Sequence, residues 1–448
     1  FICIKGYHSD AHKYARNAYD AGVRAFIAEL MLDLPSDAGI LYVADSRLAL
    51  SRVSACFFDY PGEKMLIIGL TGTKGKTSTS YMIRSILEMN GYRTGIIGTN
   101  GIHYNDYNSE TDNSTPESYE IQYHLRMMLD GNCNAAIIEA TSQAFKLSRV
   151  ADLTFDISIF TNIGNDHIGE IEHKDFAEYL DCKKQIFKHS KKVIVNRDTE
   201  HYEDIIKDVG TPIITYGFSP EADYLGENAE YQTQRHKFIT SFYCKHTHAL
   251  KKYDLNIPGK FSVENALGAV ALTTELNIPY DSIRTGLRNA VVYGRMEVLP
   301  DTENIFVIID YAHNEMSMTS LFETVALYEH GKVINVFGAG GNRSKLRRYS
   351  MGEVSGRFAD LSVITSDNPR YEKLDDIIGD ILVGMKKTEG KYVVIKDRRE
   401  AILYALAQAK ENDIVLLCGK GQQDFEEVNG IKTYFNERDV VREFFQSK

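Results

Sequence analysis

Short apolar runs alternate with amphipathic stretches along almost the whole chain. The apolar runs have the length of buried strands, and the stretches between them carry apolar residues at helical spacing. This alternation is typical of α/β proteins whose sheets are largely parallel. The predicted strands are 65–70, 135–139, 157–161 and 193–196 in the middle of the chain, and 305–310, 333–337, 362–365, 393–395 and 414–417 towards its end.

Interruptions of the pattern divide the chain into three predicted domains. The stretch from Tyr60 to Lys64 contains the proline, glycine and charges of a linker, and a further unit starts near Arg295. We therefore expect domains at 1–62, 63–294 and 295–448. Because Phe1 stands inside an apolar run that reads as a strand, we expect the first domain to be truncated.

Composition narrows the class of protein. The 448 residues are 43% hydrophobic and 25% charged, as in an ordinary globular protein, and the net charge of −11 leaves no basic surplus for a nucleic-acid partner. The six cysteines lack CxxC or Cys/His spacing, which predicts reduced thiols and a cytoplasmic location rather than zinc or disulfides. No apolar run approaches the roughly 18 residues that a membrane span needs, so no membrane partner is expected.

A glycine-rich turn after the strand at 65–70 is the strongest local signal for chemistry. It leads into a helix predicted from Thr77 to about Asn90, and it reads Gly69-Leu70-Thr71-Gly72-Thr73-Lys74-Gly75-Lys76-Thr77-Ser78. Glycines let backbone N–H groups face phosphate oxygens, Lys76 and the helix N-terminus add positive charge, and a threonine hydroxyl suits Mg²⁺. The spacing departs from a strict Walker A motif, because Leu70 occupies the place of its first glycine. The turn still predicts an ATP loop.

Two further strand ends carry candidate metal ligands. Glu139 ends the strand at 135–139, and Asp166 and His167 follow the strand at 157–161. Carboxylates, and at times an imidazole, surround Mg²⁺ in phosphoryl-transfer sites. Taken alone, each of these residues is more often a helix cap or a solvated loop residue, and their place at the mouth of the ATP-loop sheet favours the metal interpretation.

Lys183 lies on the apolar face of a predicted helix at 176–187. It follows Tyr179 by four residues and precedes Phe187 by four, whereas Lys184 points away from that face. A lysine on such a face either extends to solvent or is desolvated, with a neutral and reactive amine. Periodicity alone leaves both possibilities open.

In combination, these motifs resemble those of the Mur ligases, which build the peptide of peptidoglycan. The similarity covers nearly the whole chain. Residues 72–77 resemble the family's ATP loop, residues 139–143 its Mg²⁺-binding E-V-S-S-[HQ] segment, and Asp166-His167 its D-H pair. Lys183 matches the lysine that the family carbamylates with CO₂. The resemblance implies an N-terminal UDP-binding α/β domain, a central P-loop ATPase domain with a parallel sheet and a C-terminal Rossmann-like domain.

The resemblance also implies roles for individual residues. Lys76, Lys183 and His167 would be catalytic, and two Mg²⁺ ions would be held by Thr77, Glu139, His167 and carbamylated Lys183. ATP would contact Gly72, Thr73, Lys74, Gly75, Lys76, Thr77, Ser78, Asn265, Arg295, Asp310 and His313, and the UDP-sugar dipeptide would contact Ser114, Thr115, Thr141 and Arg149.

The amino-acid pocket of the resembled family decides the subtype. Residues 367–370 resemble the D-N-P-R segment of family members that add meso-diaminopimelate to UDP-MurNAc-L-Ala-D-Glu. The resemblance implies an amino-acid pocket made of Arg343, Asp367, Asn368, Pro369, Arg370, Gly419 and Gln423. Two residues depart from the family pattern. Gln423 is an amide where the family has a glutamate for the substrate's ammonium, and Leu147 replaces the usual glutamine two residues before Arg149.

The expected activity is therefore ATP-dependent amide-bond formation through an acyl phosphate, by a monomer that acts on small molecules. Two alternatives stay open. One is a Mur-type ligase that adds lysine or resembles folylpolyglutamate synthase, and the other is a non-catalytic nucleotide-binding regulator with the same fold. The regulator is disfavoured by the presence of Glu139, His167 and Lys183, since a protein that only binds nucleotide needs no second metal ion.

Substitution of Lys76 tests the ATP loop. Lys76→Ala removes a fixed positive charge from the transferring phosphate, so kcat should fall by about 10²–10³. Steady-state ligation kinetics measure the effect. If kcat held and only the KM for the UDP-sugar substrate rose, the turn at 72–77 would not be the ATP loop.

Overall fold

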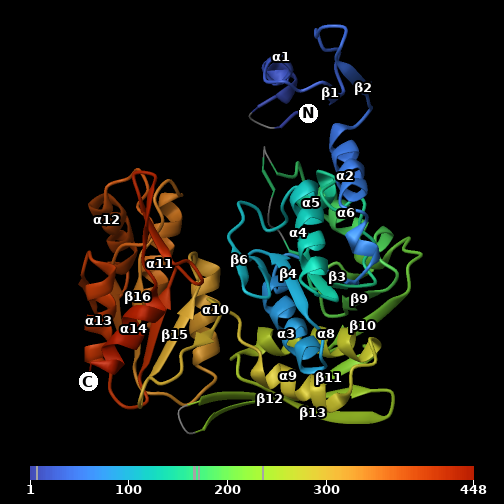
Figure 1. Ribbon diagram of the computed structural model, residues 1–448. Coiled ribbons are helices and arrows are strands. Elements are labelled where there is room, and N and C mark those ends of the chain that lie inside the picture. The colour runs from blue at the N-terminus through green and yellow to red at the C-terminus, as the bar shows by residue number, and fades with distance from the viewer. Residues whose placement is uncertain (7–8, 165–167, 170–171, 235–236, 448) are drawn as a thin grey trace. The chain divides into compact units, whose positions relative to one another are not determined.

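The computed structural model describes residues 1–6, 9–164, 168–169, 172–234 and 237–447. The chain forms two compact α/β units (Figure 1). The first comprises Phe1–Gly226, Cys244–Leu250 and Asn265–Gly286, and the second comprises Glu227–Tyr243, Lys251–Glu264 and Leu287–Lys448. The predicted domain bounds 1–62, 63–294 and 295–448 stay a prediction. Within the described ranges, no helix is long and apolar enough to cross a bilayer.

The N-terminal part of the first unit is a small layered body. Strands β1 (Ala25–Ala28) and β2 (Gly39–Tyr42) pair in parallel. Their core is made by Cys3, Ala15, Phe26 and Ala28. The accompanying helices are η1 (Ala11–Tyr14), α1 (Ala15–Asp20), α2 (Ser46–Phe57) and η2 (Pro61–Glu63), the last within the stretch that reads as a linker.

The central sheet has eleven strands in the order β13-β12-β11-β10-β9-β8-β3-β7-β4-β5-β6. Strands β8, β3, β7 and β4 are parallel neighbours, so their carboxyl ends share one edge. The strands are β3 (Leu66–Thr71), β4 (Thr94–Gly98), β5 (Gly101–Tyr104), β6 (Tyr107–Ser109), β7 (Ala135–Glu139), β8 (Ile157–Phe160), β9 (Val193–Asn196), β10 (Ile213–Gly217), β11 (Tyr224–Gln234), β12 (Lys237–His246) and β13 (Ala249–Leu255).

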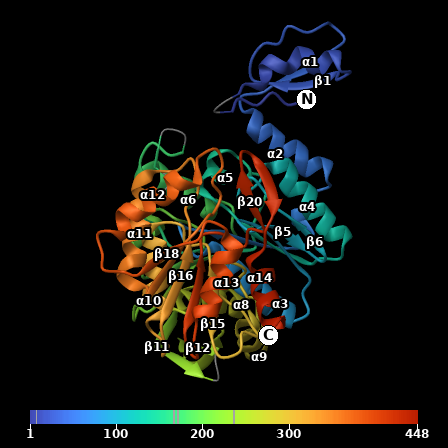
Figure 2. The same ribbon diagram turned by 90° about the vertical axis from the view of Figure 1, so that its left-hand side faces the viewer.

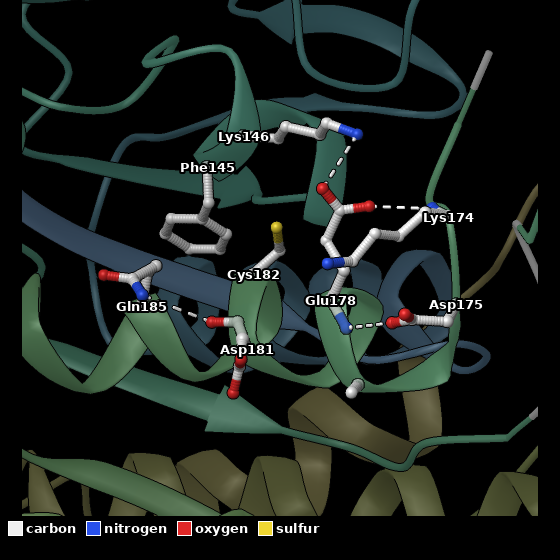
Figure 3. A pocket seen from close by; sticks show the side chains of 9 residues that line it. Phe145, Lys146, Lys174, Asp175, Glu178, Asp181, Cys182 and Gln185 are labelled. Atoms are coloured by element: carbon white, nitrogen blue, oxygen red, sulfur yellow. Dashed lines mark hydrogen bonds and ion pairs between the residues drawn. The ribbon is translucent and has the colours of Figure 1, made fainter. Parts of the chain in front are cut away.

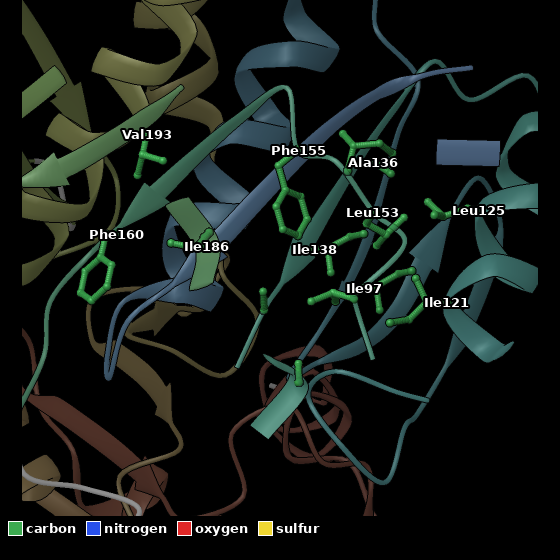
Figure 4. Packing of buried hydrophobic residues seen from close by; sticks show 14 of the residues in the cluster. Ile97, Ile121, Leu125, Ala136, Ile138, Leu153, Phe155, Phe160, Ile186 and Val193 are labelled. Carbon is green, nitrogen blue, oxygen red and sulfur yellow. The ribbon is translucent and has the colours of Figure 1, made fainter. Parts of the chain in front are cut away.

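Helices cover the middle of this sheet because β4, β7, β8 and β9 are buried along their whole length. In Figure 4, Ile121 and Leu125 from one helix and Ile186 from another pack with Ile138 and Phe155 of the sheet region. Their burial removes apolar surface from water, at about 25 cal/mol for each Å². The helices are α3 (Lys76–Met89), α4 (Ser118–Asp130), α5 (Ser142–Lys146), α6 (Phe176–Lys188), α7 (Tyr202–Ile206), α8 (Lys260–Glu275) and α9 (Tyr280–Asn289).

The second unit is a three-layer sandwich (Figures 1 and 2). Its sheet has the order β14-β15-β19-β16-β17-β18, and only the β14–β15 pair is antiparallel. The strands are β14 (Glu297–Val298), β15 (Phe306–Asp310), β16 (Val333–Phe337), β17 (Leu361–Ile364), β18 (Tyr392–Val394) and β19 (Ile414–Cys418). One apolar cluster joins the sheet to α10 (Glu315–Val325), α11 (Lys345–Phe358) and α12 (Leu374–Met385), and another joins it to α13 (Arg398–Gln408) and α14 (Glu437–Gln446).

A buried ion pair fixes two strand ends of this unit. Arg398 and Glu437, each with 1% side-chain exposure, pair at 2.7 Å. The same guanidinium donates to the carbonyl oxygens of Ser366 and Cys418, both at 2.8 Å. Those carbonyls stand where the loops after β17 and β19 begin, so the ion pair sets the start of both loops. A hairpin of β20 (Phe425–Val428) and β21 (Ile431–Tyr434) follows β19.

Candidate active site

The predicted ATP loop joins β3 to α3. Gly72 and Gly75 have φ angles of 144° and 87°, which only glycine adopts readily. A Cβ atom on Gly72 would lie 1.9 Å from Thr161 Oγ1, and one on Gly75 would lie 2.4 Å from Asn265 Oδ1. The glycines are therefore required both by backbone conformation and by space. Asn265, predicted to contact ATP, does lie against the loop.

The end of β8 holds this loop in place. The Thr73 and Lys74 N–H groups donate to Asn162 O and Asn162 Oδ1, both at 2.9 Å. The Thr161 hydroxyl donates to Lys74 O at 2.7 Å. The loop backbone is thus fixed before any nucleotide binds, and Lys76, Thr77 and Ser78 form the first turn of α3.

Lys76 and Lys183 meet at one carbonyl oxygen. Each Nζ atom donates to Gly72 O at 2.8 Å, and Lys76 Nζ also reaches Thr73 O at 3.3 Å. Lys183 is 2% exposed and its Nζ lies 4.7 Å from the centre of the Tyr179 ring. Of the two possibilities that periodicity leaves open, the structure has the desolvated one. Lys184, in contrast, donates to the carbonyls of Asp204 and Lys207 on another side of the helix.

Glu139 is a buried carboxylate with one oxygen free for a cation. Its Oε2 atom accepts from Thr77 Oγ1 at 3.1 Å and from Thr99 Oγ1 at 2.9 Å. Its Oε1 atom is buried and has no hydrogen-bond partner among the residues that the structure describes, and the side chain is fully buried. An unpaired buried carboxylate oxygen is costly unless something positive binds it. Thr77, Glu139 and Thr99 present the hard oxygen ligands that Mg²⁺ prefers, so these residues fit the expected metal.

In the part of the chain that the structure describes, no three His, Cys, Asp or Glu side chains gather as a cluster that could hold a metal ion. Mg²⁺ commonly binds one or two carboxylates and completes its coordination with phosphate oxygens and water. His167, the other predicted ligand, lies outside the described residues, as does Asp166.

The predicted contacts of the UDP-sugar dipeptide adjoin Glu139. The Thr115 hydroxyl donates to Glu139 O at 2.6 Å and lies 3.1 Å from Thr141 Oγ1. Ser114 Oγ lies 2.9 Å from Thr99 Oγ1, whose proton points to Glu139, so the Ser114 hydroxyl can donate to Thr99. The structure therefore brings three predicted hydroxyl groups together beside the candidate metal ligand.

Arg149 is held next to these hydroxyl groups. Its Nη1 atom donates to Thr115 O at 2.9 Å, and its Nη2 atom pairs with Glu117 Oε1 at 2.9 Å. Arg47 pairs with the same carboxylate at 3.2 Å. Glu117 and Arg47 are absent from the predicted set, because only the fold brings residues 47, 117 and 149 together.

A hollow of about 380 Å³ lies outside this constellation (Figure 3). It is formed by α5 and α6, with Lys146 paired to Glu178 across it at 3.2 Å. Burial raises the pKa of the Cys182 thiol on its wall, which keeps the thiol protonated. None of the predicted site residues lines it.

The second unit carries the remaining predicted ATP contacts. Asp310 ends β15, and its carboxylate accepts from the N–H groups of Met296 at 2.7 Å and Ala312 at 2.8 Å. Burial raises the pKa of Asp310, against the lowering effect of Arg295. Burial also lowers the pKa of His313, whose Nδ1 lies 2.7 Å from Tyr311 O. Because a carbonyl oxygen can only accept, Nδ1 carries the proton in this contact. Because its pKa is lowered, the ring is neutral at pH 7.

The predicted amino-acid pocket is built from the loops after β16, β17 and β19. Asp367 and Asn368 are 6% and 5% exposed, and a Cβ atom on Gly419 would lie 2.4 Å from Asp367 Oδ2. Asn368 Nδ2 donates to Gln423 Oε1 at 2.9 Å. A Cβ atom on Gly341 would lie 1.8 Å from Pro369 O, so the β16 loop approaches the β17 loop closely.

The side chains of two arginines of the pocket lie next to each other. Arg343 and Arg370 both lie within about 4 Å of the place where a Cβ on Gly340 would stand. Burial first, and then Arg370, lower the pKa of Arg343. Arg370 Nη1 donates to Gly341 O at 3.0 Å and Arg370 Nε contacts Glu427 Oε2 at 3.3 Å. Glu427 was not expected from the sequence.

Lys420 is a second residue that the sequence did not single out. It is fully buried, and its Nζ atom donates to Asp367 O, Asn368 Oδ1 and Phe425 O at 3.2, 3.2 and 2.8 Å. Burial lowers the pKa of this amine. Its contacts tie the β17 loop to the segment after β19.

Comparison with known proteins identifies the family. Residues 70–273 match the Mur ligase middle domain, and residues 294–421 match the Mur ligase, glutamate ligase domain. The chain is 35% identical to UDP-N-acetylmuramoyl-L-alanyl-D-glutamate–2,6-diaminopimelate ligase 1 of Clostridium acetobutylicum, over 100% of this chain and 92% of that protein. It is 36% identical to the enzyme of the corresponding name from Caldanaerobacter subterraneus subsp. tengcongensis, over 99% of this chain and 91% of that protein.

Solved structures show the same similarity. A UDP-N-acetylmuramoyl-L-alanyl-D-glutamate–2,6-diaminopimelate ligase superposes with a TM-score of 0.73 at 25% identity, over 100% of this chain and 92% of that one. MurF ligase from Thermotoga maritima in complex with ADP shares the fold, with a TM-score of 0.63 at 19% identity, over 100% and 94%. The predicted α/β fold class and ligase class are confirmed. The chain belongs to the Mur ligase family of ATP-dependent, ADP-forming ligases.

Proposed function

We propose that this protein adds meso-diaminopimelate to the D-glutamate of UDP-MurNAc-L-Ala-D-Glu, with ATP as the energy source. The observation that carries the proposal is the meeting of Lys76, Lys183 and Glu139 around the Gly72 loop. The names of the relatives at 35% and 36% identity support the same substrates. We infer that it acts in the cytoplasm as a monomer on these small molecules.

In the first step, the D-glutamate side-chain carboxylate attacks the γ-phosphorus of ATP, ADP leaves and an acyl phosphate forms. The N–H groups at the start of α3 face the phosphates, and Lys76 stabilises the charge that develops on the transferring group. Two Mg²⁺ ions, held by Thr77, Glu139, His167 and carbamylated Lys183, would supply further positive charge.

In the second step, the amine of the diamino acid attacks the acyl carbon, and phosphate leaves as the amide forms. Ser114, Thr115, Thr141 and Arg149 would hold the UDP-sugar dipeptide so that its carboxylate faces the ATP loop. The hydrogen bonds among Thr115, Thr141 and Glu139 support this assignment, since they fix the hydroxyl groups beside the proposed metal ligand. The chain's contribution is chiefly to position the reactants.

Charge at the Gly72 carbonyl supports a carbamate on Lys183. Two lysine amines at 2.8 Å from one oxygen repel each other if both are protonated. Lys183 is 2% exposed and its Nζ lies 4.7 Å from the centre of the Tyr179 ring, so the amine is shielded from bulk water. A neutral amine can attack CO₂ and release a proton. The resulting carbamate is an anion, which would attract Lys76 and bind Mg²⁺.

Glu139→Gln tests the proposed metal ligand. The substitution keeps the shape and removes the charge, so kcat should fall by about 10² or more and the Mg²⁺ dependence of ADP release should shift to higher concentration. Asp156→Asn is the matched control, because that carboxylate accepts from Ile67 N–H at the opposite end of the same strands. Equal Mg²⁺ dependence of Glu139→Gln and wild type would exclude Glu139 as a ligand.

Lys183→Ala tests the carbamate. Ligation should be lost while ATP binding is largely retained, and added short carboxylates should restore part of the rate. Lys184→Ala, one residue along the same helix, should keep wild-type activity. Isotope-labelled bicarbonate should give a carbamate NMR signal in the wild type that is absent from Lys183→Ala. Wild-type activity of Lys183→Ala would contradict the assignment.

A panel of amino acids tests the substrate. Lysine lacks the distal carboxylate that Arg370 can pair with, and such a charge-assisted pair is worth roughly 2–5 kcal/mol. We expect kcat/KM for meso-diaminopimelate to exceed that for L-lysine or L-ornithine by at least about tenfold. Arg370→Ala should reduce this preference, whereas Arg357→Ala, an exposed arginine of α11, should not.

Two outcomes of the panel would decide against parts of the proposal. Preference of the wild type for lysine would leave the ligase reaction intact and change the subtype. ATP binding without any ADP release, with or without the dipeptide substrate, would favour the non-catalytic nucleotide-binding regulator instead.

A further inference from the structure

The pocket for the amino acid lacks the carboxylate that its motif leads one to expect. Gln423 occupies that place in the chain, and an amide carries no charge with which to neutralise a substrate ammonium. Its Oε1 atom already accepts a hydrogen bond from Asn368 Nδ2 at 2.9 Å. Gln423 therefore helps to hold the β17 loop and leaves the ammonium without an anionic partner.

The β20–β21 hairpin brings another carboxylate to the same loop. β20, labelled in Figure 2, bonds to it through its backbone. Arg370 N–H donates to Glu427 O at 3.0 Å, and Asn429 N–H donates to Arg370 O at 2.7 Å. Glu427 N–H donates to Asn368 Oδ1 at 2.9 Å. These three hydrogen bonds fix the backbone position of Glu427 relative to Asn368 and Arg370.

The side chain of Glu427 lies on the guanidinium that is expected to bind the substrate carboxylate. Glu427 Oε2 contacts Arg370 Nε at 3.3 Å, and the two side chains are 22% and 26% exposed. The pair is thus neither fully buried nor free in solvent. A partly exposed ion pair with one contact can rearrange around a ligand, because solvent offsets much of the energy of its single contact.

The other charges of the pocket leave a need for this carboxylate. Arg343 and Arg370 are two neighbouring cations. The charges of Asp367 and Glu437 act on the buried cations Arg398 and Lys420, and that of Glu426 also acts on Lys420. Glu427 is the carboxylate that contacts Arg370 itself, where an incoming ammonium would otherwise meet the two arginines.

We propose that Glu427 binds the distal ammonium of the diamino acid and so replaces the glutamate that Gln423 displaced. The distal end of meso-diaminopimelate carries one carboxylate and one ammonium. Arg370 would pair with this carboxylate and Glu427 with this ammonium, so that each charge of the substrate's distal end meets an opposite charge. Glu427 is then a specificity-determining residue, and the inference rests on the proposed diamino-acid ligase function.

The test compares two substrates that differ only at the distal ammonium. L-2-Aminopimelate keeps the reacting amine and the distal carboxylate of meso-diaminopimelate and lacks the distal amine. In the wild type we expect kcat/KM to favour meso-diaminopimelate by at least about tenfold. In Glu427→Gln the ratio should fall to within about twofold, while the KM values for ATP and the UDP-sugar dipeptide stay unchanged. Adding Gln423→Glu to that variant should raise the ratio again.

A merely structural role of Glu427 predicts a different result. If Glu427 only oriented Arg370, Glu427→Gln would weaken both substrates equally and the ratio would persist, which would overturn the inference. Glu426→Gln is the matched control, since it removes the same charge from the adjacent hairpin position. An equal loss of preference in Glu426→Gln would also overturn it. If the wild type ligated no diamino acid, the proposed function itself would fail.

Discussion

The parallel order β8-β3-β7 is the constraint on which the rest of the proposed ATP site depends. Its register sets Leu70 opposite Glu139 and Thr71 opposite Phe160, so three strands end at one edge. Each end then supplies a different part. β3 gives the Gly72 loop, β8 gives the Thr161–Asn162 segment that bonds to it, and β7 gives the buried carboxylate. Any slip in register would separate these groups, because a shift of one residue reverses the face of every side chain.

The groups at this edge suit an anionic substrate that arrives with a cation. The amines of Lys76 and Lys183 both donate to the Gly72 carbonyl, whereas Glu139 Oε1 has no hydrogen-bond partner among the described residues. In the proposed site, a nucleoside triphosphate would supply anions for the two amines, and its magnesium would supply a cation for Glu139. The same groups would then stabilise the charge that moves during phosphoryl transfer.

Local patterns predicted the parts of the fold whose burial is continuous. β7, β9 and β16 begin and end at the predicted residues, because each is an apolar run buried along its whole length. Strands β11 to β13 were missed, and β11 shows why: its alternating burial gives no apolar run. Among the candidate site residues, Glu139 stands at a predicted strand end, and Lys183 stands on a predicted apolar helix face, where periodicity left its burial open. Thr99 and Glu117 act through partners 40 and 32 residues away, which no local pattern reveals.

The proposed amino-acid pocket illustrates how a carboxylate can be supplied from outside a motif. A motif specifies a residue type at one sequence position, whereas binding of an ammonium depends only on where a carboxylate lies in the pocket. The hairpin bonds of Arg370 to Glu427 and Asn429 deliver a carboxylate to the pocket loop from four residues beyond Gln423. Lys420 makes this possible, because its buried amine joins the carbonyl of Asp367 to that of Phe425, where the hairpin begins. Loss of the motif's glutamate is therefore compatible with an ammonium-binding pocket, provided that the hairpin keeps its register on the β17 loop.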